Sequence, residues 1–595
     1  MKRVLSLFLS LGACIIYLYS CTDQKTPEKK IADTLLQQVS EFVDRCNTLQ
    51  QAAALPSPNE AELQQLFLKA RLAYKQFEWA AEYFDPSATR AVNGAPVQEV
   101  ELSGVVFEPA GLQVIESFLF PRYDSSKKLQ LAEQLRQLVV KCNNYKTHFG
   151  GIAIFNWQVF DAAKLEVFRI MTLGITGFDD PLSLDCMRES AAALKSVQSA
   201  LGWYLDENDI EQVKQKSDAA IAYLNDHTSF NNFDRAGFIV AYANPVTAAI
   251  TDGEKRLQLH PALYNRLLKQ DARTLFDSGA WNVNAYSPDP SAFVTQEKIK
   301  LGEKLFADPS LSGNGIRSCL SCHQPGKAFT DGLIKNTDIE NHRSLARNTP
   351  TLINAALQPA QFYDMRVKTL EDQSRTVVQS AEEMHGSIHL SVAKLWNDPS
   401  YREMFSRTFP GSGRTGIDTF EVMNALGSYI RSLVFMNSRF DEYMRGHSDA
   451  MNADQVSGFN LFMGKAKCGT CHYMPLFNGN FPPRYVKMET EVIGVPASRD
   501  KKEIDSDPGR FAIIPVESFR HSFKVPTVRN VTRTAPYMHN GVFDNLEQVI
   551  NFYNGGGGTG WGEKIPNQTL PTDSLNLTDK EKQQLIAFMK ALDSK

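Results

Sequence analysis

The chain has 595 residues, of which 43% are hydrophobic and 22% charged, as is ordinary for a globular protein of two to four domains. Its formal net charge of −4 at pH 7 lacks the basic excess expected of a nucleic-acid-binding protein, so we exclude nucleic acid as a partner.

The N-terminus has the pattern of an export signal. The basic residues Lys2 and Arg3 precede an apolar run over residues 4–19, too short for a comfortable membrane span but suited to a signal sequence. Ser20 and Cys21 resemble the end of a bacterial lipoprotein signal, which predicts a signal peptide over residues 1–21 and a lipid on Cys21. Residues 11–14 match the consensus of that motif better, but cleavage before Cys14 would leave the apolar residues 15–18 exposed at the N-terminus. An uncleaved anchor is the other alternative. We expect an exported, periplasm-facing protein attached to a membrane.

Residues 22–276 have helical periodicity and predict a helical-bundle domain. Apolar side chains recur at helical spacing, as at Leu35, Val39 and Phe42, and proline is sparse within these runs. Residues 277–291 combine glycine and proline with Asn, Ser and Asp, which is typical of a linker. After it the chain changes to short helices between Gly- and Pro-rich loops.

Two copies of the motif Cys-x-x-Cys-His follow the linker. The first comprises Cys319, Cys322 and His323, and the second comprises Cys468, Cys471 and His472. In such a motif the two thiols bind the haem vinyl groups, and the adjacent histidine binds the iron. A zinc site would need two further soft ligands, and no other cysteine lies near either motif. We therefore predict two covalently bound haem c groups.

The motifs belong to a longer internal repeat. Residues 301–306 precede the first motif as residues 458–462 precede the second, and residues 350–354 correspond to residues 526–530. We expect two cytochrome c-like domains over residues 292–450 and 451–595. The whole chain is predicted to be all-α, with a helical bundle followed by these two haem domains.

The region downstream of each motif must supply the group on the far side of its iron. In the first domain this region contains Gln373 and Glu383. A carboxylate in an apolar pocket, with a raised pKa, is suited to moving a proton between the two oxygens of peroxide. A solvated helix residue is the alternative for Glu383.

In the second domain, Leu546, Val549, Ile550 and Tyr553 share one helical face because their offsets are three, four and seven. Tyr553 thus points inward. It is either a core residue or an oxygen ligand to the second iron, a type of ligation known in catalase. Met538 and His539 are chemically plausible competitors.

Residues 293–589 resemble the bacterial diheme cytochrome c peroxidase and MauG family. The matching segments include residues 301–312, 347–351, 361–364, 370–373 and 525–541, in this order. The resemblance implies a peroxidatic haem on His323 and an electron-transfer haem on His472. It also implies Glu383 as the acid–base residue with Gln373 beside it, although Ser380 and Ala381 stand where the family usually has Asn-Pro.

The resemblance implies further sites between the haems. A calcium ion would be held by the side chain of Asn348 and by the carbonyls of Thr534 and Pro536, oxygen ligands that suit Ca²⁺. Tyr363 occupies the position of the family's inter-haem tryptophan. His342 lies in the loop where peroxidase members keep a histidine that blocks the iron, but we expect it to be exposed.

Tyr553 separates two branches of this family. Peroxidase members have methionine 14 residues after the histidine that matches His539, whereas this chain has Tyr553 there. The MauG branch has a tyrosine ligand at this iron. An anionic oxygen ligand should lower the potential of the haem relative to methionine.

The bundle has one weaker resemblance. Residues 111–116 are similar to the Gly-x-His-x-x-Glu signature of imelysin-like helical domains, which are linked to iron uptake, but Gln113 replaces the histidine. Glutamine is a poorer metal ligand, so we predict a docking or spacer domain.

Three functions are consistent with the sequence. The first is a peroxidase that reduces hydrogen peroxide with electrons from a small cytochrome c, a cupredoxin or a quinol, passed from the His472 haem to the His323 haem. The second is a MauG-like diheme oxidase that modifies a protein or small molecule. The third is a non-catalytic electron carrier, which would need both irons fully ligated.

Overall fold

A computed structural model describes residues 25–100, 104–205, 207–410, 416–499 and 501–595. The predicted signal peptide and Cys21 lie outside these residues. Within them, no helix is both long enough and apolar enough to cross a membrane.

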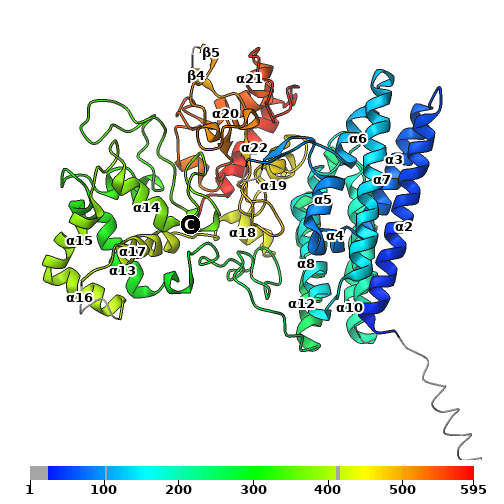
Figure 1. Cartoon of the computed structure of the whole chain (residues 1–595), viewed down its shortest axis with the longest axis horizontal. Coiled ribbons are helices and arrows are strands. Elements are labelled where there is room, and N and C mark those ends of the chain that lie inside the picture. The colour runs from blue at the N-terminus through cyan, green and yellow to red at the C-terminus, as the bar shows by residue number, and fades with distance from the viewer. Residues whose placement is uncertain (1–24, 101–103, 206, 411–415, 500) are drawn as a thin grey trace, which may run out of the picture.

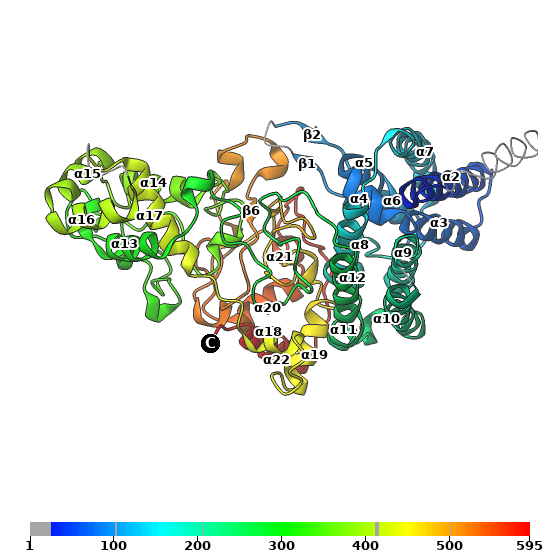
Figure 2. The same ribbon diagram turned by 90° about the horizontal axis from the view of Figure 1, so that it is seen from below.

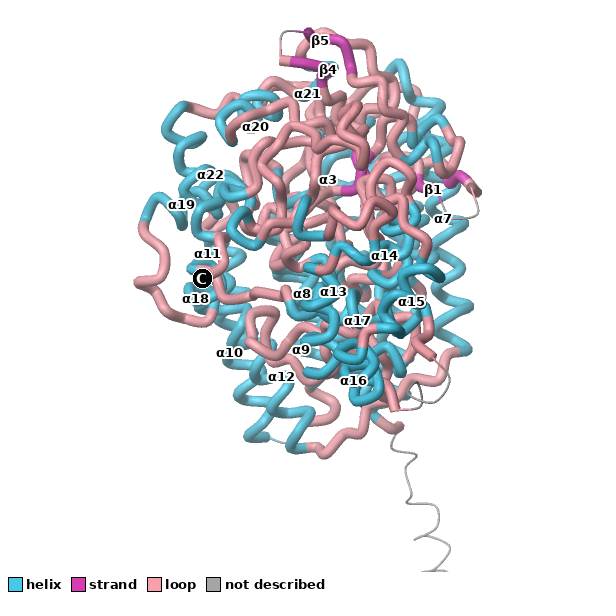
Figure 3. The backbone as a smooth tube through the Cα atoms, turned by 90° about the vertical axis from the view of Figure 1, so that its left-hand side faces the viewer, coloured by secondary structure: helices cyan, strands magenta, loops and turns pink. Residues whose placement is uncertain are grey.

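The described chain is mainly helical, with loops concentrated in its second half (Figure 3). The helices of the first half are α2 (Pro27–Ala54), α3 (Glu60–Lys75), α4 (Glu78–Phe84), α5 (Pro86–Asn93), α6 (Leu112–Leu119), α7 (Lys128–Gly151), α8 (Asn156–Thr172), α9 (Cys186–Leu201), α10 (Glu207–Asp226), α11 (Arg235–Phe238) and α12 (Asn244–Arg256). Those of the second half are α13 (Gln296–Ala307), α14 (Leu370–Gln379), α15 (Ile388–Asn397), α16 (Pro399–Thr408), α17 (Thr419–Ser432), α18 (Arg439–Met444), α19 (Ala453–Phe462), α20 (Leu546–Asn554), α21 (Gly557–Gly560) and α22 (Asp579–Ala591).

Among the described residues, three short antiparallel strand pairs accompany these helices. They are β1 (Glu99–Val100) with β2 (Val106–Phe107), β3 (Thr490–Glu491) with β6 (Phe523–Lys524), and β4 (Pro496–Ser498) with β5 (Lys501–Ile504). The predicted all-α class therefore describes the bulk of the chain, and the strand pairs are an addition that the sequence did not indicate.

The first half forms a bundle because its helices carry continuous apolar stripes. In α2, the side chains of Ile31, Leu35, Val39 and Phe42 are buried, and the Thr26 side chain caps the helix by accepting from the Lys29 amide. Helix α2 packs along α3 and α7. Helices α3 and α5 likewise begin with side-chain caps, from Asn59 and Asp85.

The helical part of this half is shorter than the sequence suggested. Helix α12 ends at Arg256, and residues 257–289 contain no helix. The predicted linker is packed against the rest of the chain, since Trp281 is only 7% exposed and its ring lies 5.2 Å from that of Tyr485. An apolar residue within a polar, proline-containing segment anchors it.

The second half is a structural repeat built on two helix crossings. Helix α13 packs against α17, and α19 packs against α22. A Cβ on Gly302 would lie 1.9 Å from the Ala425 carbonyl oxygen, and one on Gly458 would lie 2.0 Å from that of Gln584. These equivalent glycines let the helices approach closely, which explains why both repeats begin with a glycine in an apolar helix.

The order of the parts in space differs from their order in the chain. The bundle lies at one end, the half with His472 in the middle, and the half with α13–α17 at the other end (Figures 1 and 2). One hydrophobic core continues from the bundle into the His472 half, joining residues such as Phe42 and Ile250 to Phe440 and Phe588. The haem half that contains α13–α17 has a separate core around Leu301 and Leu426.

Candidate active site

The first Cys-x-x-Cys-His motif lies on a short 3-10 turn, Cys319–Ser321, capped by Ser318. The Nδ1 atom of His323 lies 2.9 Å from the Phe329 carbonyl oxygen. Nδ1 therefore carries the proton and donates it to this carbonyl, and Nε2 is left to bind a metal. Burial lowers the pKa of His323, which keeps the imidazole neutral as metal binding requires.

The second motif repeats this arrangement. Its turn is Cys468–Thr470, and His472 Nδ1 lies 3.0 Å from the Pro526 carbonyl oxygen. Burial lowers the pKa of His472 to about 4. A phenylalanine ring lies 6.4 Å from each histidine, Phe306 beside His323 and Phe462 beside His472. The two motifs therefore present equivalent ligands.

Both motifs face one connected cavity of about 2760 Å³. Its lining includes both histidines and all four cysteines of the motifs, and these thiols are free. Two thiols and one available imidazole nitrogen at each place, next to a large space, fit the attachment of two haem groups. In the described part of the chain, no group of three or more His, Cys, Asp or Glu side chains is arranged to hold a metal ion.

Glu383 and Gln373 line this cavity together with His323. Gln373 lies on α14, which begins at Leu370 as the repeat predicted. Glu383 lies in the loop after that helix. Burial raises the pKa of Glu383, and the charges of Arg366 and Arg317 partly oppose this effect. A carboxyl group with a raised pKa holds a proton more readily than a solvated one, which suits a proton-transfer group.

The backbone of the Glu383 loop is held at three consecutive carbonyls. The Glu382 carbonyl accepts from the Ile339 amide at 2.8 Å, and the Met384 carbonyl accepts from the Gly313 amide at 2.8 Å. Between them, the Glu383 carbonyl accepts from the Arg317 guanidinium at 3.2 Å. Arg317 also donates to the carbonyls of Thr337 and Asp338. The segment before Cys319 thus fixes the loop that carries Glu383.

Tyr553 lies on α20, and its neighbours on the predicted helical face, Leu546, Val549 and Ile550, line the cavity with it. Burial is the main cause that raises the pKa of Tyr553, and Cys471, Cys468 and Glu491 add to it. The phenol is therefore close to the second motif.

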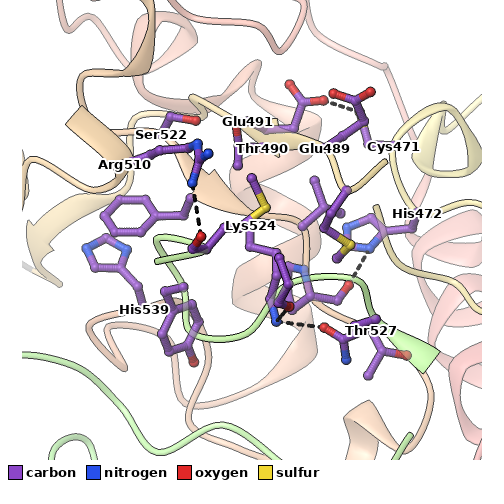
Figure 4. Close-up of a pocket in the computed structure, with 18 of the residues that line it drawn as sticks. Cys471, His472, Glu489, Thr490, Glu491, Arg510, Ser522, Lys524, Thr527 and His539 are labelled. Carbon is purple, nitrogen blue, oxygen red and sulfur yellow. Dashed lines mark hydrogen bonds between the residues drawn. The ribbon is translucent and has the colours of Figure 1, made fainter. Parts of the chain in front are cut away.

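Glu491 is a further carboxylate at this centre. Cys471 Sγ lies 3.4 Å from Glu491 Oε1, as Figure 4 shows. Burial raises the pKa of Glu491 to about 7. A group with this pKa changes its charge in the physiological range.

Met538 and His539 have different surroundings. Met538 lines the cavity in a left-handed backbone conformation, with φ of 74°. His539 stacks on Phe523 with ring centroids 3.8 Å apart, and its Nε2 lies 3.3 Å from Asp505. The His539 ring is therefore engaged with protein groups.

Tyr363 lines the cavity, in contact with Lys524. The Lys524 amide donates to the Tyr363 carbonyl at 2.7 Å, and the Lys524 ammonium donates to Gln358 at 2.6 Å (Figure 4). Burial lowers the pKa of Lys524 to about 8 and raises that of Tyr363. An aromatic residue and a cation thus lie next to each other in the lining of the cavity.

The predicted calcium ligands Asn348, Thr534 and Pro536 all line this cavity. The side-chain nitrogen Nδ2 of Asn348 donates to the carbonyls of Leu333 and Ile334 at 2.8 and 3.2 Å, which leaves the side-chain oxygen Oδ1 for another partner. His342 lies on the surface, with its side chain 75% exposed and next to Glu340.

Gln113 and Glu116 serve helix packing in the bundle. Gln113 donates to the Asn93 carbonyl at 2.9 Å, and Glu116 accepts from the amide and hydroxyl of Ser183.

The sequence did not single out Arg317, Lys524 or Glu491. Arg317 is two residues from a haem cysteine, and that proximity is the one local signal for it. Lys524 lies two residues before the repeated segment 526–530. Glu491 has no recognisable signal, because its neighbour Cys471 is 20 residues away.

Residues 296–449 match the family model described as di-haem cytochrome c peroxidase. The chain is 33% identical to the methylamine utilization protein MauG of Methylorubrum extorquens over 306 residues, which cover 51% of this chain and 81% of that protein. It is 34% identical to cytochrome c551 peroxidase of Nitrosomonas europaea over 264 residues, covering 44% of this chain and 75% of that protein.

Similarity to solved structures covers about the same share of the chain. A crystal structure of a MauG-like protein associated with microbial copper homeostasis is 29% identical, with a TM-score of 0.46, and covers 53% of this chain and 96% of that one.

Proposed function

Because the chain belongs to the di-haem cytochrome c peroxidase and MauG family, and is an oxidoreductase with two haem cofactors, we propose that it reduces hydrogen peroxide to water. The reaction consumes two protons and two electrons for each peroxide and yields two water molecules. The electrons come from a small redox protein, a cytochrome c or a cupredoxin, and pass from the His472 centre to the His323 centre.

When bound, the haems supply the electron transfer and the iron at which peroxide reacts. The protein supplies the proton chemistry. The Glu383 carboxylate takes a proton from one peroxide oxygen and delivers it to the other, which then leaves as water. Gln373, which lines the same cavity, donates a hydrogen bond that orients the peroxide. The raised pKa of Glu383 in the cavity beside His323 is the observation that carries this proposal, because it lets the carboxyl group hold the proton between its uptake and its release.

Peroxide turnover tests this function. The holoenzyme is mixed with hydrogen peroxide and a reduced small cytochrome c or cupredoxin, and oxidation of the donor is followed by absorbance. Glu383→Gln removes the proton-transfer group without changing its size. We expect a loss of about 10²- to 10⁴-fold in kcat, with both haems still attached.

The neighbouring Glu382 offers a matched control. Its side chain is 51% exposed and pairs with Arg343, so Glu382→Gln should retain activity. Wild-type protein that oxidises no donor, and whose haem spectrum does not respond to peroxide, would show that the proposed reaction is wrong. Equal losses in both variants would remove the role of Glu383.

A MauG-like oxidation of a protein or small molecule is the second candidate. It is favoured by Tyr553, which lies in the cavity near the second motif. Peroxide would then change the haem spectra without rapid oxidation of a donor cytochrome. Product analysis after peroxide addition, with and without reduced donor, separates the two activities.

The calcium site and the export route belong to the same proposal. Asn348, Thr534 and Pro536 would supply oxygen ligands to one Ca²⁺ between the centres. Metal analysis of the purified protein, and its activity after chelation, test this site. Attachment of haem on the periplasmic side and a lipid on Cys21 are tested by fractionation and by the mass of the N-terminal peptide.

A further inference from the structure

The bundle reaches the His472 centre through Phe178. The Phe178 ring lies 6.1 Å from the ring of Tyr473, the residue after His472, and 5.6 Å from that of Phe481. Thr176, Gly177 and Phe178 line the same cavity as His472 and Cys471. A segment of the bundle, outside the residues 296–449 that match the family model, therefore contributes to the surroundings of this centre.

Local backbone geometry presents Phe178 to the cavity. The short turn Gly174–Thr176 ends at Gly177, which has a left-handed conformation with φ of 74°. A Cβ on Gly177 would lie 3.0 Å from the Phe230 ring and 3.3 Å from Leu184. Glycine is needed at position 177 because the backbone is left-handed and because a side chain would collide with Phe230. The side chain of the next residue, Phe178, lines the cavity.

Asp179, the residue after Phe178, is locked in a buried ion network. It accepts two hydrogen bonds from Arg169, at 2.7 and 2.8 Å, and one each from Lys75 and Asn93, at 2.6 and 3.1 Å. Burying such charges has a high desolvation cost, but the hydrogen-bonded network holds the groups that it connects in one arrangement. Here it fixes the position of the Phe178 backbone.

A second anchor lies on the other side of the turn. Arg235, which is fully buried, donates to the Ile175 carbonyl at 2.8 Å. Its guanidinium also lies against Gly464, where a Cβ would be 2.7 Å from Nη1. Gly464 is four residues before Cys468. The turn is thus held against the segment that attaches the second haem.

The contact between bundle and haem half extends beyond this turn. The Asn460 side chain bonds both Asp234 and the Ala236 amide, at 2.9 and 3.0 Å. Glu99, on β1, pairs with Lys487 at 3.1 Å. The strands β1 and β2 reach from the bundle toward the haem half in Figure 2. The two parts therefore share one interface on this side of the cavity.

We propose that the bundle forms one wall of the His472 haem pocket, with Phe178 as the side chain that excludes water from that haem and thereby sets its potential. Solvent exclusion and local dielectric are among the main means by which a protein tunes a haem potential. This role needs a haem on His472 but does not depend on peroxide turnover.

The direction of the effect follows from the charge of the second iron's ligands. With an anionic tyrosine oxygen bound, the oxidised centre is neutral and the reduced centre is negative. Water stabilises the charged form, so opening the wall should raise the potential. With a neutral methionine or histidine ligand, the oxidised form is the charged one, and opening the wall should lower the potential.

Potentiometry of the holoenzyme tests the wall. Phe178→Ala opens it, and Phe178→Leu keeps most of the apolar side chain. Spectropotentiometric titrations, with the two haems resolved by electron paramagnetic resonance, report each centre separately. We expect Phe178→Ala to raise the potential of the His472 haem, Phe178→Leu to shift it less, and the His323 haem to be unchanged in both.

A matched control separates the wall from a general loosening of the bundle. Phe67 is fully buried in the bundle and packs on Phe120, so Phe67→Ala removes the same side chain away from the interface. It should lower the melting temperature and leave both potentials unchanged. Asp179→Asn, which weakens the anchor, should move the His472 potential in the same direction as Phe178→Ala.

Two results would overturn the proposal. One is an unchanged His472 potential in folded Phe178→Ala protein, and the other is an equal shift in Phe67→Ala. A lower potential of the His472 haem alone in Phe178→Ala protein would support the role of Phe178 as a wall of the pocket, and would contradict tyrosine as the ligand of the second iron.

Discussion

The backbone carbonyl of Glu383 accepts a hydrogen bond from the guanidinium of Arg317 at 3.2 Å. Arg317 stands two residues before Cys319, so the proposed proton shuttle and the attachment point of the first haem are joined through one side chain. Its positive charge also favours the ionised form of Glu383, against the effect of burial.

Replacement of Arg317 should shift the pH dependence of peroxide turnover. Without this charge, Arg366 is the remaining cation that opposes burial and the nearby Glu382, so the pKa of Glu383 rises further. The shuttle must start as a carboxylate, so the acidic limb of kcat/KM should move to higher pH in Arg317→Met. Loss of the charged hydrogen bond should also lower kcat/KM on the order of tenfold.

Two variants serve as controls for Arg317. Arg317→Lys keeps the charge and should restore most of the pH profile. Arg343→Met removes an arginine that is 70% exposed and contacts Glu382, and it should leave the profile unchanged. An unshifted acidic limb in Arg317→Met would show that this charge does not act on Glu383.

Tyr553→Met tests the ligand of the second iron. Methionine is a neutral ligand that raises haem potentials, and axial ligands span a range of ~0.8 V. We therefore expect a higher potential for the His472 haem, measured by spectropotentiometry. Tyr537→Phe removes a nearby hydroxyl that donates to Val531 and should have little effect. An unaltered spectrum in Tyr553→Met would leave Met538 or His539 as the ligand.

The potential of the His472 haem should fall as the pH rises through about 7. Burial raises the pKa of Glu491 to about 7, and above that value the carboxylate is negative and opposes the addition of an electron. The slope cannot exceed about 59 mV per pH unit for one proton per electron. Titrations at pH 6 and 8 should show this fall in the wild type and a flatter response in Glu491→Gln. Glu489→Gln, which removes a carboxylate paired with Lys487, is the control.

The buried pair of Asp441 and Arg529 should support the His472 half strongly. Two hydrogen bonds of 2.7 and 2.9 Å join the side chains, which are each about 1% exposed. Removing one partner leaves a buried unpaired charge, so Asp441→Ala should lower the free energy of unfolding by about 3–5 kcal/mol. Denaturant unfolding of the holoprotein measures this. Asp441→Leu combined with Arg529→Met should recover much of the loss, because no charge is then left unpaired.

The repeat was accessible from the sequence because its signals are local. The cysteine spacing, the glycine of each crossing helix and the offsets from Leu546 to Tyr553 all lie within a few turns of chain. The structure brings the two motifs and the face from Leu546 to Tyr553 to one cavity, which Gln373 and Glu383 also line. The roles of the individual side chains stay predictions until they are measured.

Other features depend on contacts that no local pattern encodes. Phe178 meets Tyr473 across nearly half the chain, and Asp179 looks like an ordinary surface residue in the sequence. The end of the helical region at Arg256 was also missed, since residues 257–276 keep enough apolar letters to resemble a helix. Tertiary packing decides such positions, whatever the local preference.

The reversal of order between chain and space has a consequence for how the protein is made. The bundle is synthesised first, yet its core is continuous with residues up to Leu592 near the end of the chain. The apolar face of the bundle that contacts the end of the chain therefore stays exposed until that segment has been synthesised. An apolar surface that stays exposed in the incomplete chain favours aggregation.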